Sequence, residues 1–387
     1  SNGGGGKAML RKLLIVTQFT TTIVILLGTV VVNRQLNYMQ RKDPGFGRDN
    51  VLVVHRAEVL GGSIDEFKEQ LNAHSNVVIA SSSTHFPAGG FWGNAHWIVG
   101  RGRDDIFTMA TYRSSYDFEK ALDLELVHGR FFSRDISTDS VGVVVNEAAL
   151  KVLGIEDPLN TRFFQPSYHG YEDEFMPIIG VVKDFHFESM QNEIKPMAIH
   201  FMDAGFPGKL VVILGEGNRR QTLSFIQDKW EELTLEHPFE YTWLDEEFSK
   251  LFDDEKNTGQ LLAIFSILSI AVTCLGLIGL ISYATSQRRK EIGVRKIMGA
   301  SIRLIMSLFS KETSILLSIS TVLSIPAYFG VRAWLQKFAY HLNFQWGLYF
   351  LVLLGVSLVV LLLALLTVSF HSYRAAAANP VESLRYE

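Results

Sequence analysis

The residues of this sequence that could carry out chemistry are few and widely spaced. Asp184 and His186 follow an apolar run, where a histidine near a carboxylate could serve as acid or base. No nucleophile or second carboxylate accompanies them, which favours a structural turn. Five histidines of the middle region are scattered, and none pairs with another at metal-ligand spacing: His85, His96, His169, His186 and His200. We expect no catalytic residue, no metal site, no cofactor and therefore no enzyme.

Other sequence features exclude further classes of function. The tract ending in Gly6 and Lys7 resembles a phosphate-binding loop, but Ala8 follows the lysine and no strand precedes it. An ATPase, if this system uses one, must therefore be a separate subunit. The single cysteine, Cys274, excludes an internal disulfide. The formal net charge of -4 gives no reason to expect nucleic-acid binding.

The elements that must position these residues are dominated by apolar segments. Hydrophobic residues make up 48% of the 387 residues, and they concentrate in one early run and three late ones. A run of about 20 uncharged residues crosses a hydrocarbon core of roughly 30 Å. The third run is weaker because Lys311 and Glu312 lie near its start and Pro326 interrupts it as a kink. We expect transmembrane helices at residues 13–32, 261–283, 305–331 and 348–370.

Basic residues beside these runs indicate the orientation. They precede the first run and crowd the loop between the second and third runs, which places the N-terminal segment and this loop in the cytoplasm. Residues 1–12 are then a cytoplasmic linker, 284–304 a cytoplasmic loop, and 371–387 a cytoplasmic tail. Residues 33–260 and the loop 332–347 lie outside. The glycine tract at the start is read as a linker, as in the second half of a tandem protein.

The large external segment alternates short apolar runs with amphipathic segments, which predicts an α+β domain inserted between helices 1 and 2. A helix over 245–260 is expected to continue into the second span as a stalk. The aromatic, glycine-rich stretch 85–97 is read as a loop that either binds a partner or folds onto its own core. Strands are expected at 51–55, 141–146, 176–182, 197–201, 210–215 and 240–244, and helices at 64–73, 116–122, 147–153 and 220–237.

Two local patterns suggest contacts with partners. Small residues recur along the second span at Ser269, Thr273, Gly276 and Gly279, where another helix can approach closely. This stripe is either ordinary packing within the chain or a dimer interface. The cytoplasmic loop predicts a short amphipathic helix that rests on membrane lipid or docks into a cytoplasmic partner.

The same loop carries a resemblance to a known family. QRRKEIGVRKIMGAS at 287–301 resembles the hallmark loop of the FtsX-like permeases of ABC transporters, which include macrolide-exporter and lipoprotein-release permeases. The ending ANPVESLRYE resembles that family's C-terminus. DFEKALDLELVHGRFF at 117–132, VNEAALKVLG at 145–154 and GVVKDFHF at 180–187 resemble its MacB-like periplasmic core domain.

This resemblance implies a multi-pass permease in the bacterial cytoplasmic membrane with its large domain in the periplasm. Its implied partners are a cytoplasmic ABC ATPase, a second permease module as homodimer or tandem pseudo-dimer, and a periplasmic adaptor in some systems. The loop would couple ATP hydrolysis to movement of the outer domain, for efflux or mechanotransmission, through Arg288, Glu291, Ile292, Val294, Arg295, Ile297, Met298 and Gly299. The alternative is a membrane-anchored sensor, and a membrane-tethered enzyme lacks a credible catalytic group.

Overall fold

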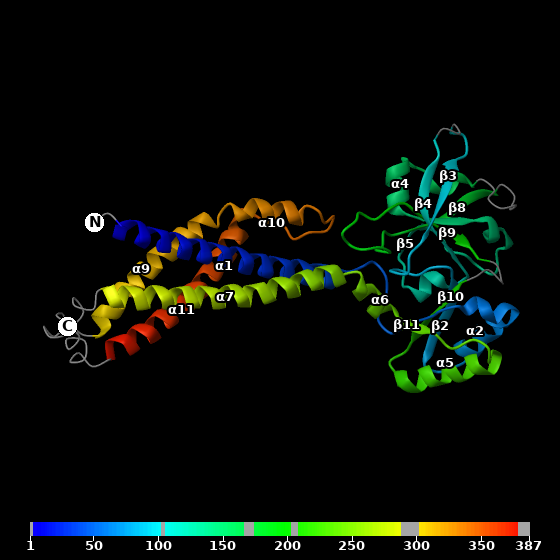
Figure 1. Cartoon of the computed structure of the whole chain (residues 1–387). Helices are drawn as coiled ribbons and strands as arrows, with labels where there is room; N and C mark the ends of the chain where they lie inside the picture. The colour runs from blue at the N-terminus through cyan, green and yellow to red at the C-terminus, as the bar shows by residue number, and fades with distance from the viewer. Residues whose placement is uncertain (1–2, 102–104, 166–173, 203–207, 288–301, 378–387) are drawn as a thin grey trace. The chain divides into compact units, whose positions relative to one another are not determined.

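The computed structural model describes residues 3–101, 105–165, 174–202, 208–287 and 302–377 (Figure 1). It forms two compact units, a helical unit of residues 1–39 and 254–387 and a sheet unit of residues 40–253. Each unit has a core of its own.

Long apolar helices build the helical unit. They are α1 (Gly3–Arg41), α7 (Asp253–Gln287), α9 (Ile302–Leu323), α10 (Ala327–Leu335) and α11 (Trp346–Ala377). Among the described residues, three segments are long and apolar enough to cross a membrane: Met9–Arg41, Asp253–Tyr283 and Trp346–Phe370. A fourth crossing exists if α9 and α10, bent by 43°, form one span. The bend lies at Pro326, as predicted, because proline lacks the N–H group that a helix needs.

Two of these helices are longer than a membrane requires. At 1.5 Å per residue, the 39 residues of α1 extend about 58 Å and the 35 residues of α7 extend about 52 Å. Both lengths exceed a hydrocarbon core of roughly 30 Å. Helix α1 already begins at Gly3, within the segment expected to be a linker, and this early part has packing partners described below.

The first lobe of the sheet unit is a four-stranded antiparallel sheet. Its order is β11 (Tyr241–Trp243), β1 (Val51–Val54), β10 (Lys209–Leu214) and β2 (Val77–Ser83). Helices α2 (Ile64–Asn72) and α5 (Arg219–Leu233) cover it. Phe67 and Trp230 are fully buried between these layers, with their ring centroids 5.9 Å apart.

The second lobe is a closed circuit of six strands. Around the circuit run β3 (Trp92–Ile98), β4 (Phe107–Ser114), β9 (Met197–Phe201), β6 (Val143–Asn146), β8 (Glu174–Val182) and β7 (Arg162–Gln165), which pairs with β3 again. Strand β5 (Leu126–Gly129) adds to β8, and α4 (Glu147–Leu153) packs on the circuit. Closure leaves few strand edges open to other chains. The lobes join where β2 pairs with β4 at Ser83 and Ser114.

Short elements complete the sheet unit. They are α3 (Phe118–Ala121), α6 (Leu244–Lys250) and the 3-10 helices η1 (Ala57–Ser63), η2 (Ser137–Val141) and η3 (Pro158–Asn160). The predicted helix over 245–260 is interrupted, because the chain turns at Leu251 and Phe252 between α6 and α7. From Asp253 onward it continues into the second predicted span, as expected. Phe252 is buried, and the centre of its ring lies 5.5 Å from that of Phe248.

Most predicted elements of the α+β domain are present, with shifts of a few residues. The stretch 85–97, expected to be a loop, instead contains most of β3, which packs through Ile98 and His96 into the second lobe. Strands β2, β4, β5 and β7 were not predicted from the sequence.

Candidate functional site: the α1–α7 seam

Polar side chains join α1 to α7 inside the helical unit. The Thr22 hydroxyl, fully buried, lies 2.6 Å from the Ser269 hydroxyl and 2.9 Å from that of Thr273. The Thr29 hydroxyl lies 2.9 Å from that of Ser266. In an apolar environment such hydroxyl pairs satisfy one another because no water is present to do so. Figure 1 shows the two helices side by side over this region.

Small residues let the same two helices approach closely. A side chain on Gly276 would collide with the amide of Gln18 on α1, and one on Gly259 would touch Val32, 3.6 Å away. As the residue number on α1 rises from 18 to 32, the number of its partner on α7 falls from 276 to 259, so the two helices are antiparallel. We call this run of contacts, from Gln18 and Gly276 to Val32 and Gly259, the α1–α7 seam.

The remaining helices are tied to this seam. Ser320 of α9 donates to the carbonyl oxygen of Val16 at 3.0 Å, and Thr321 donates to Ser357 of α11 at 3.1 Å. Thr367 of α11 donates to the sulfur of Cys274 at 3.6 Å. The four long helices are thereby linked in a closed set, and α1 supplies its most buried apolar side chains.

Charged and aromatic side chains mark the two ends of this bundle. At one end, Lys12 pairs with Glu312 at 2.7 Å, and the Arg11 guanidinium lies 3.3 Å from the centre of the Tyr283 ring. The charge of Glu312, which weakened the third predicted span, therefore has a partner. At the other end the rings of Tyr328 and Trp346 stack 3.7 Å apart. Aromatic residues of this kind gather at membrane interfaces.

The buried amide of Gln35 closes the same aromatic end. It donates to the carbonyl oxygen of Tyr340 at 2.9 Å and accepts from the N–H of Leu342 at 2.9 Å. Both bonds join α1 to the chain between α10 and α11. Gln35 was not singled out in the sequence, and neither were Gln18, Thr22 and Thr29, although each is a polar residue in or beside a predicted span.

The predicted partner contacts have different outcomes. The eight coupling-loop residues, Arg288 through Gly299, lie outside the described residues, so the coupling helix stays a prediction. Ser269, Thr273 and Gly276 of the small-residue stripe contact α1 within the chain, as the packing interpretation expects. In the part of the chain that the structure describes, no atom lies within 4 Å of the position that a side chain on Gly279 would take. The dimer interpretation stays a prediction, and Gly279 is where it has most room.

Within the sheet unit, Asp184 and His186 make structural contacts. The Asp184 carboxylate accepts from the N–H of Ala148 at 2.8 Å, which caps the first turn of α4. Burial raises the pKa of Asp184 above its usual value. The N–H of His186 donates to the carbonyl oxygen of Pro44 at 2.7 Å, and burial lowers the pKa of this histidine to about 4.

His96 and His200, which are not at metal-ligand spacing in the sequence, contact each other in the structure. Their Nε2 atoms lie 3.3 Å apart on β3 and β9, and both residues are buried. They are 104 positions apart in the chain, so only the pairing of both strands with β4 brings them together. Among the described residues, no group of three or more histidine, cysteine, aspartate or glutamate side chains could hold a metal ion.

Two of the sequence motifs in the sheet unit, at 117–132 and 180–187, meet at one backbone crossing. A side chain on Gly129, which has φ +69°, would collide with the carbonyl oxygen of Ile179, and one on Gly180 would collide with that of Arg130. The Arg130 guanidinium forms two hydrogen bonds with the buried carboxylate of Asp139. These motifs therefore build the fold of the second lobe, and the contacts made by their residues are structural.

Comparison with known proteins identifies the C-terminal third of the chain. Residues 263–380 match the family described as FtsX-like permease C-terminal. An uncharacterized ABC transporter permease of Bacillus subtilis, YvrN, is 28% identical over 127 residues, which are 33% of this chain. The chain covers 30% of the length of that relative.

Solved structures similar to part of the chain have low identity. The periplasmic region of MacB from Actinobacillus actinomycetemcomitans has a TM-score of 0.38 and 15% identity, and covers 51% of this chain and 91% of its own. A domain of a permease protein from Porphyromonas gingivalis has a TM-score of 0.37 and 15% identity, and the match covers 51% of this chain and 90% of that domain. The extracellular domain of the ABC-type transporter YknZ, from Gram-positive bacteria, has a TM-score of 0.34 and 13% identity over 50% and 98%.

Proposed function

Because residues 263–380 carry an FtsX-like permease domain, we propose that this chain is the membrane subunit of an ABC transporter. The observation that carries the proposal is that this matched segment provides most of α7 together with α9, α10 and α11, which pack with α1 into one apolar helical unit. A separate cytoplasmic ATPase subunit would supply the energy, as the match to an ABC transporter permease family implies.

The topology that we propose has four spans, with the bent pair α9–α10 crossing as one. The end of the bundle that holds Lys12, Arg11 and Glu312 then faces the cytoplasm, beside the strongly basic loop 284–304. The aromatic end at Tyr328 and Trp346 faces the outside of the bacterial cytoplasmic membrane. The sheet unit lies outside with it, between the first and second spans.

In this arrangement the loop contacts the ATPase and the α1–α7 seam carries its movement outward. Helix α7 is continuous from Asp253 to Gln287, so its outer turns and its cytoplasmic end belong to one rod. A second permease module would pack on the exposed side of α7 near Gly279, where apolar side chains such as Leu275 and Val272 are exposed in the single chain. Membrane lipid would cover the rest.

The coupling loop provides the first test. We would co-purify the full chain in detergent with a candidate cytoplasmic ABC ATPase, for wild type and for the double variant Val294→Glu and Ile297→Glu. Two new charges on the apolar face of the predicted coupling helix should abolish recruitment of the ATPase, because burying an unpaired carboxylate in an interface is costly. The rate of ATP hydrolysis in the membrane fraction should fall together with this recruitment.

The matched control places the same substitutions on exposed apolar residues of the sheet unit, Val152→Glu and Leu235→Glu, which are 65% and 92% exposed. These should leave recruitment unchanged. A wild-type chain that recruits no ATPase would contradict the permease proposal. The sensor alternative would then have to be tested through ligands of the sheet unit.

A further inference from the structure

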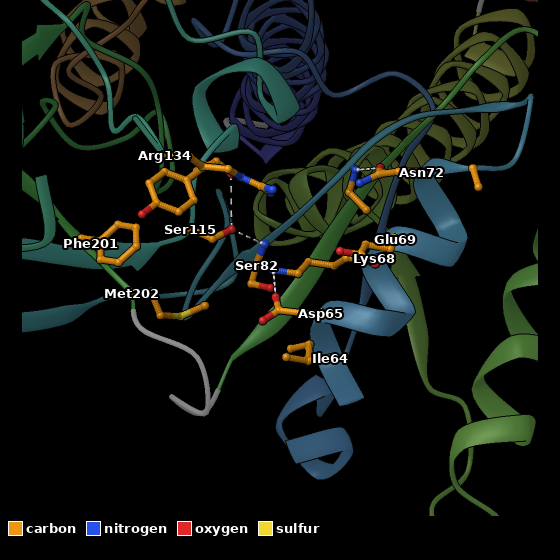
Figure 2. Close-up of a pocket in the computed structure, with 13 residues that line it drawn as sticks. Ile64, Asp65, Lys68, Glu69, Asn72, Ser82, Ser115, Arg134, Phe201 and Met202 are labelled. Carbon is orange, nitrogen blue, oxygen red and sulfur yellow. Dashed lines mark hydrogen bonds and ion pairs between the residues drawn. The ribbon is translucent and has the colours of Figure 1, made fainter. Parts of the chain in front are cut away.

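A cleft of about 710 Å³ opens between the two lobes of the sheet unit. One wall is α2 with the outer edge of β2, and the other is formed by Ser115, Tyr116, Arg134, Phe201 and Met202 (Figure 2). It begins where β2 and β4 part, since these strands pair only at Ser83 and Ser114 among the described residues. A ligand in this cleft would contact both lobes.

Side chains occupy the strand edge that faces the cleft. The N–H of Ala80 donates to the Asn72 amide oxygen at 2.8 Å, and the N–H of Ser82 donates to the Ser115 hydroxyl at 3.0 Å. Each of these oxygens stands where the carbonyl of a neighbouring strand would lie. These two N–H groups of β2 are therefore already satisfied, so a ligand in the cleft would bond to side chains and would not pair with them as an added strand.

One buried hydroxyl in the lining lacks a partner. Ser82 is 2% exposed, and its Oγ makes no hydrogen bond with any part of the chain that the structure describes. Figure 2 shows this side chain among the lining residues, between Ser115 and the side chains of α2. Buried polar atoms almost always have a partner, so an unpartnered one in a cleft wall points to a ligand that supplies it.

The charges of the two walls differ in kind. On α2, Asp65 pairs with Lys68 at 2.6 Å, and the Glu69 carboxylate lies one position further along. On the opposite wall the Arg134 guanidinium stands 5.5 Å from the centre of the Tyr116 ring, which is 4.8 Å from that of Phe201. Because Asp65 is paired with Lys68, the negative charge left on the α2 wall is that of Glu69, and the opposite wall carries the positive charge of Arg134. An anion alone or a cation alone would meet repulsion from one wall.

We propose that this cleft binds a short peptide with free ends, in extended form beside β2. Its ammonium group would lie near Glu69, its carboxylate near Arg134, and a main-chain group would bond to the Ser82 hydroxyl. Aromatic rings of Tyr116 and Phe201 would pack on its backbone or side chains. The inference concerns the sheet unit alone and does not depend on the proposed coupling to an ATPase.

The test measures binding to the full chain in detergent with tetra-alanine as the probe. Hydrogen exchange of residues 64–83 is followed as the peptide is raised to about 10 mM, well above a Kd of about 1 mM. The same titration uses N-acetyl-tetra-alanine, which lacks the ammonium group, tetra-alanine amide, which lacks the carboxylate, and methyl glucoside as a neutral polyol. Saturable protection by tetra-alanine is expected, with each capped peptide binding about tenfold more weakly.

Three variants assign the contacts. Ser82→Ala should weaken tetra-alanine binding about tenfold. Arg134→Gln should remove the difference in affinity between tetra-alanine and its amide. Glu69→Gln should remove the difference in affinity between tetra-alanine and its acetylated form. Ser140→Ala and Arg162→Gln, on exposed residues outside the cleft lining, should bind as wild type. Thermal unfolding of each variant verifies that it is folded.

Three results would overturn the proposal: no saturable protection by tetra-alanine, equal protection by free and capped peptides, or stronger protection by methyl glucoside. Because the readout is binding to the sheet unit, it is independent of ATPase recruitment. A chain that recruits an ATPase but shows none of these peptide effects would keep the proposed function and lose this inference.

Discussion

At the scale of single residues, the buried groups of the sheet unit serve its stability. Gly129 and Gly180 permit two backbones to cross, and no larger residue fits at either position without moving a carbonyl group. Asp139 is 1% exposed, and its carboxylate accepts from Arg130 and from the N–H of Ser133 at 2.8 Å. These residues lie in or beside segments that resemble the MacB-like periplasmic core domain in sequence. The structure gives the physical reason why glycine, arginine and aspartate occupy these positions.

The His96–His200 pair makes the stability of the sheet unit sensitive to acid. Burial lowers the pKa of His96 to about 4 and lowers that of His200 well below its usual value, to which His96 and Arg113 add. In the unfolded chain both would titrate near about 6.5. The unfolded state therefore takes up protons first as the pH falls. The contribution of the neutral histidines to the free energy of unfolding is fully present above about pH 6.5 and is lost as the pH falls toward 4. For His96 this loss is on the order of 3 kcal/mol.

Urea unfolding of the chain at a series of pH values checks this prediction. Wild type should lose stability steadily below about pH 6.5, whereas the double variant His96→Gln and His200→Gln should show a flatter dependence whatever its stability at neutral pH. His128→Gln is the matched control, because His128 is exposed on β5. A double variant with the wild-type pH dependence would show that other groups cause the acid sensitivity.

At the scale of elements, the α1–α7 seam is the feature that orders the helical unit. Interhelical hydroxyl bonds inside membranes average about 0.6 kcal/mol and reach about 1.7 kcal/mol. Thr22 makes two of them. Thr22→Val should therefore lower the free energy of unfolding in detergent by about 1 kcal/mol, because Ser269 and Thr273 lose a buried partner.

Thr17→Val is the control, since Thr17 is exposed and its hydroxyl donates to the Leu13 carbonyl of its own helix. It should change the free energy of unfolding by less than half as much as Thr22→Val. Titration of both variants with a denaturing detergent, followed by circular dichroism, provides the measurement. Equal effects of the two substitutions would mean that the seam bonds do not stabilise the helix pair.

The sequence predicted these elements unequally. The apolar spans were predictable because a run of about 20 uncharged apolar residues is rare outside membrane-spanning helices, and α4 and β9 have the predicted bounds. Strands β2 and β3 were not predicted because serine, glycine and histidine interrupt their apolar pattern and non-local pairing stabilises them. Only one side of the α1–α7 seam could be predicted. The small residues on α7 have a recognisable spacing, whereas their partner Thr22 on α1 lies among threonines with no distinctive spacing.

At the scale of the whole molecule, the proposed function requires that one continuous element link the ATPase side to the outside. We propose α7 for this role, because it runs without a break from Asp253 to Gln287 and ends at the predicted coupling loop. Inserting three glycines between Asn257 and Thr258 should interrupt α7 just before the predicted span at 261–283, since glycine is a poor helix former. The cytoplasmic loop is untouched by this change.

We therefore expect the insertion variant to recruit the ATPase as wild type does, while ATP binding no longer changes hydrogen exchange in residues 40–253. The same three glycines inserted after Leu235, which is 92% exposed and lies outside helices and strands, should leave both properties intact. If the ATP-dependent change in exchange survives the insertion in α7, another helix carries the movement. Because α1 is the other helix of the seam and is continuous to Arg41, the insertion would then be repeated there, after Asn33.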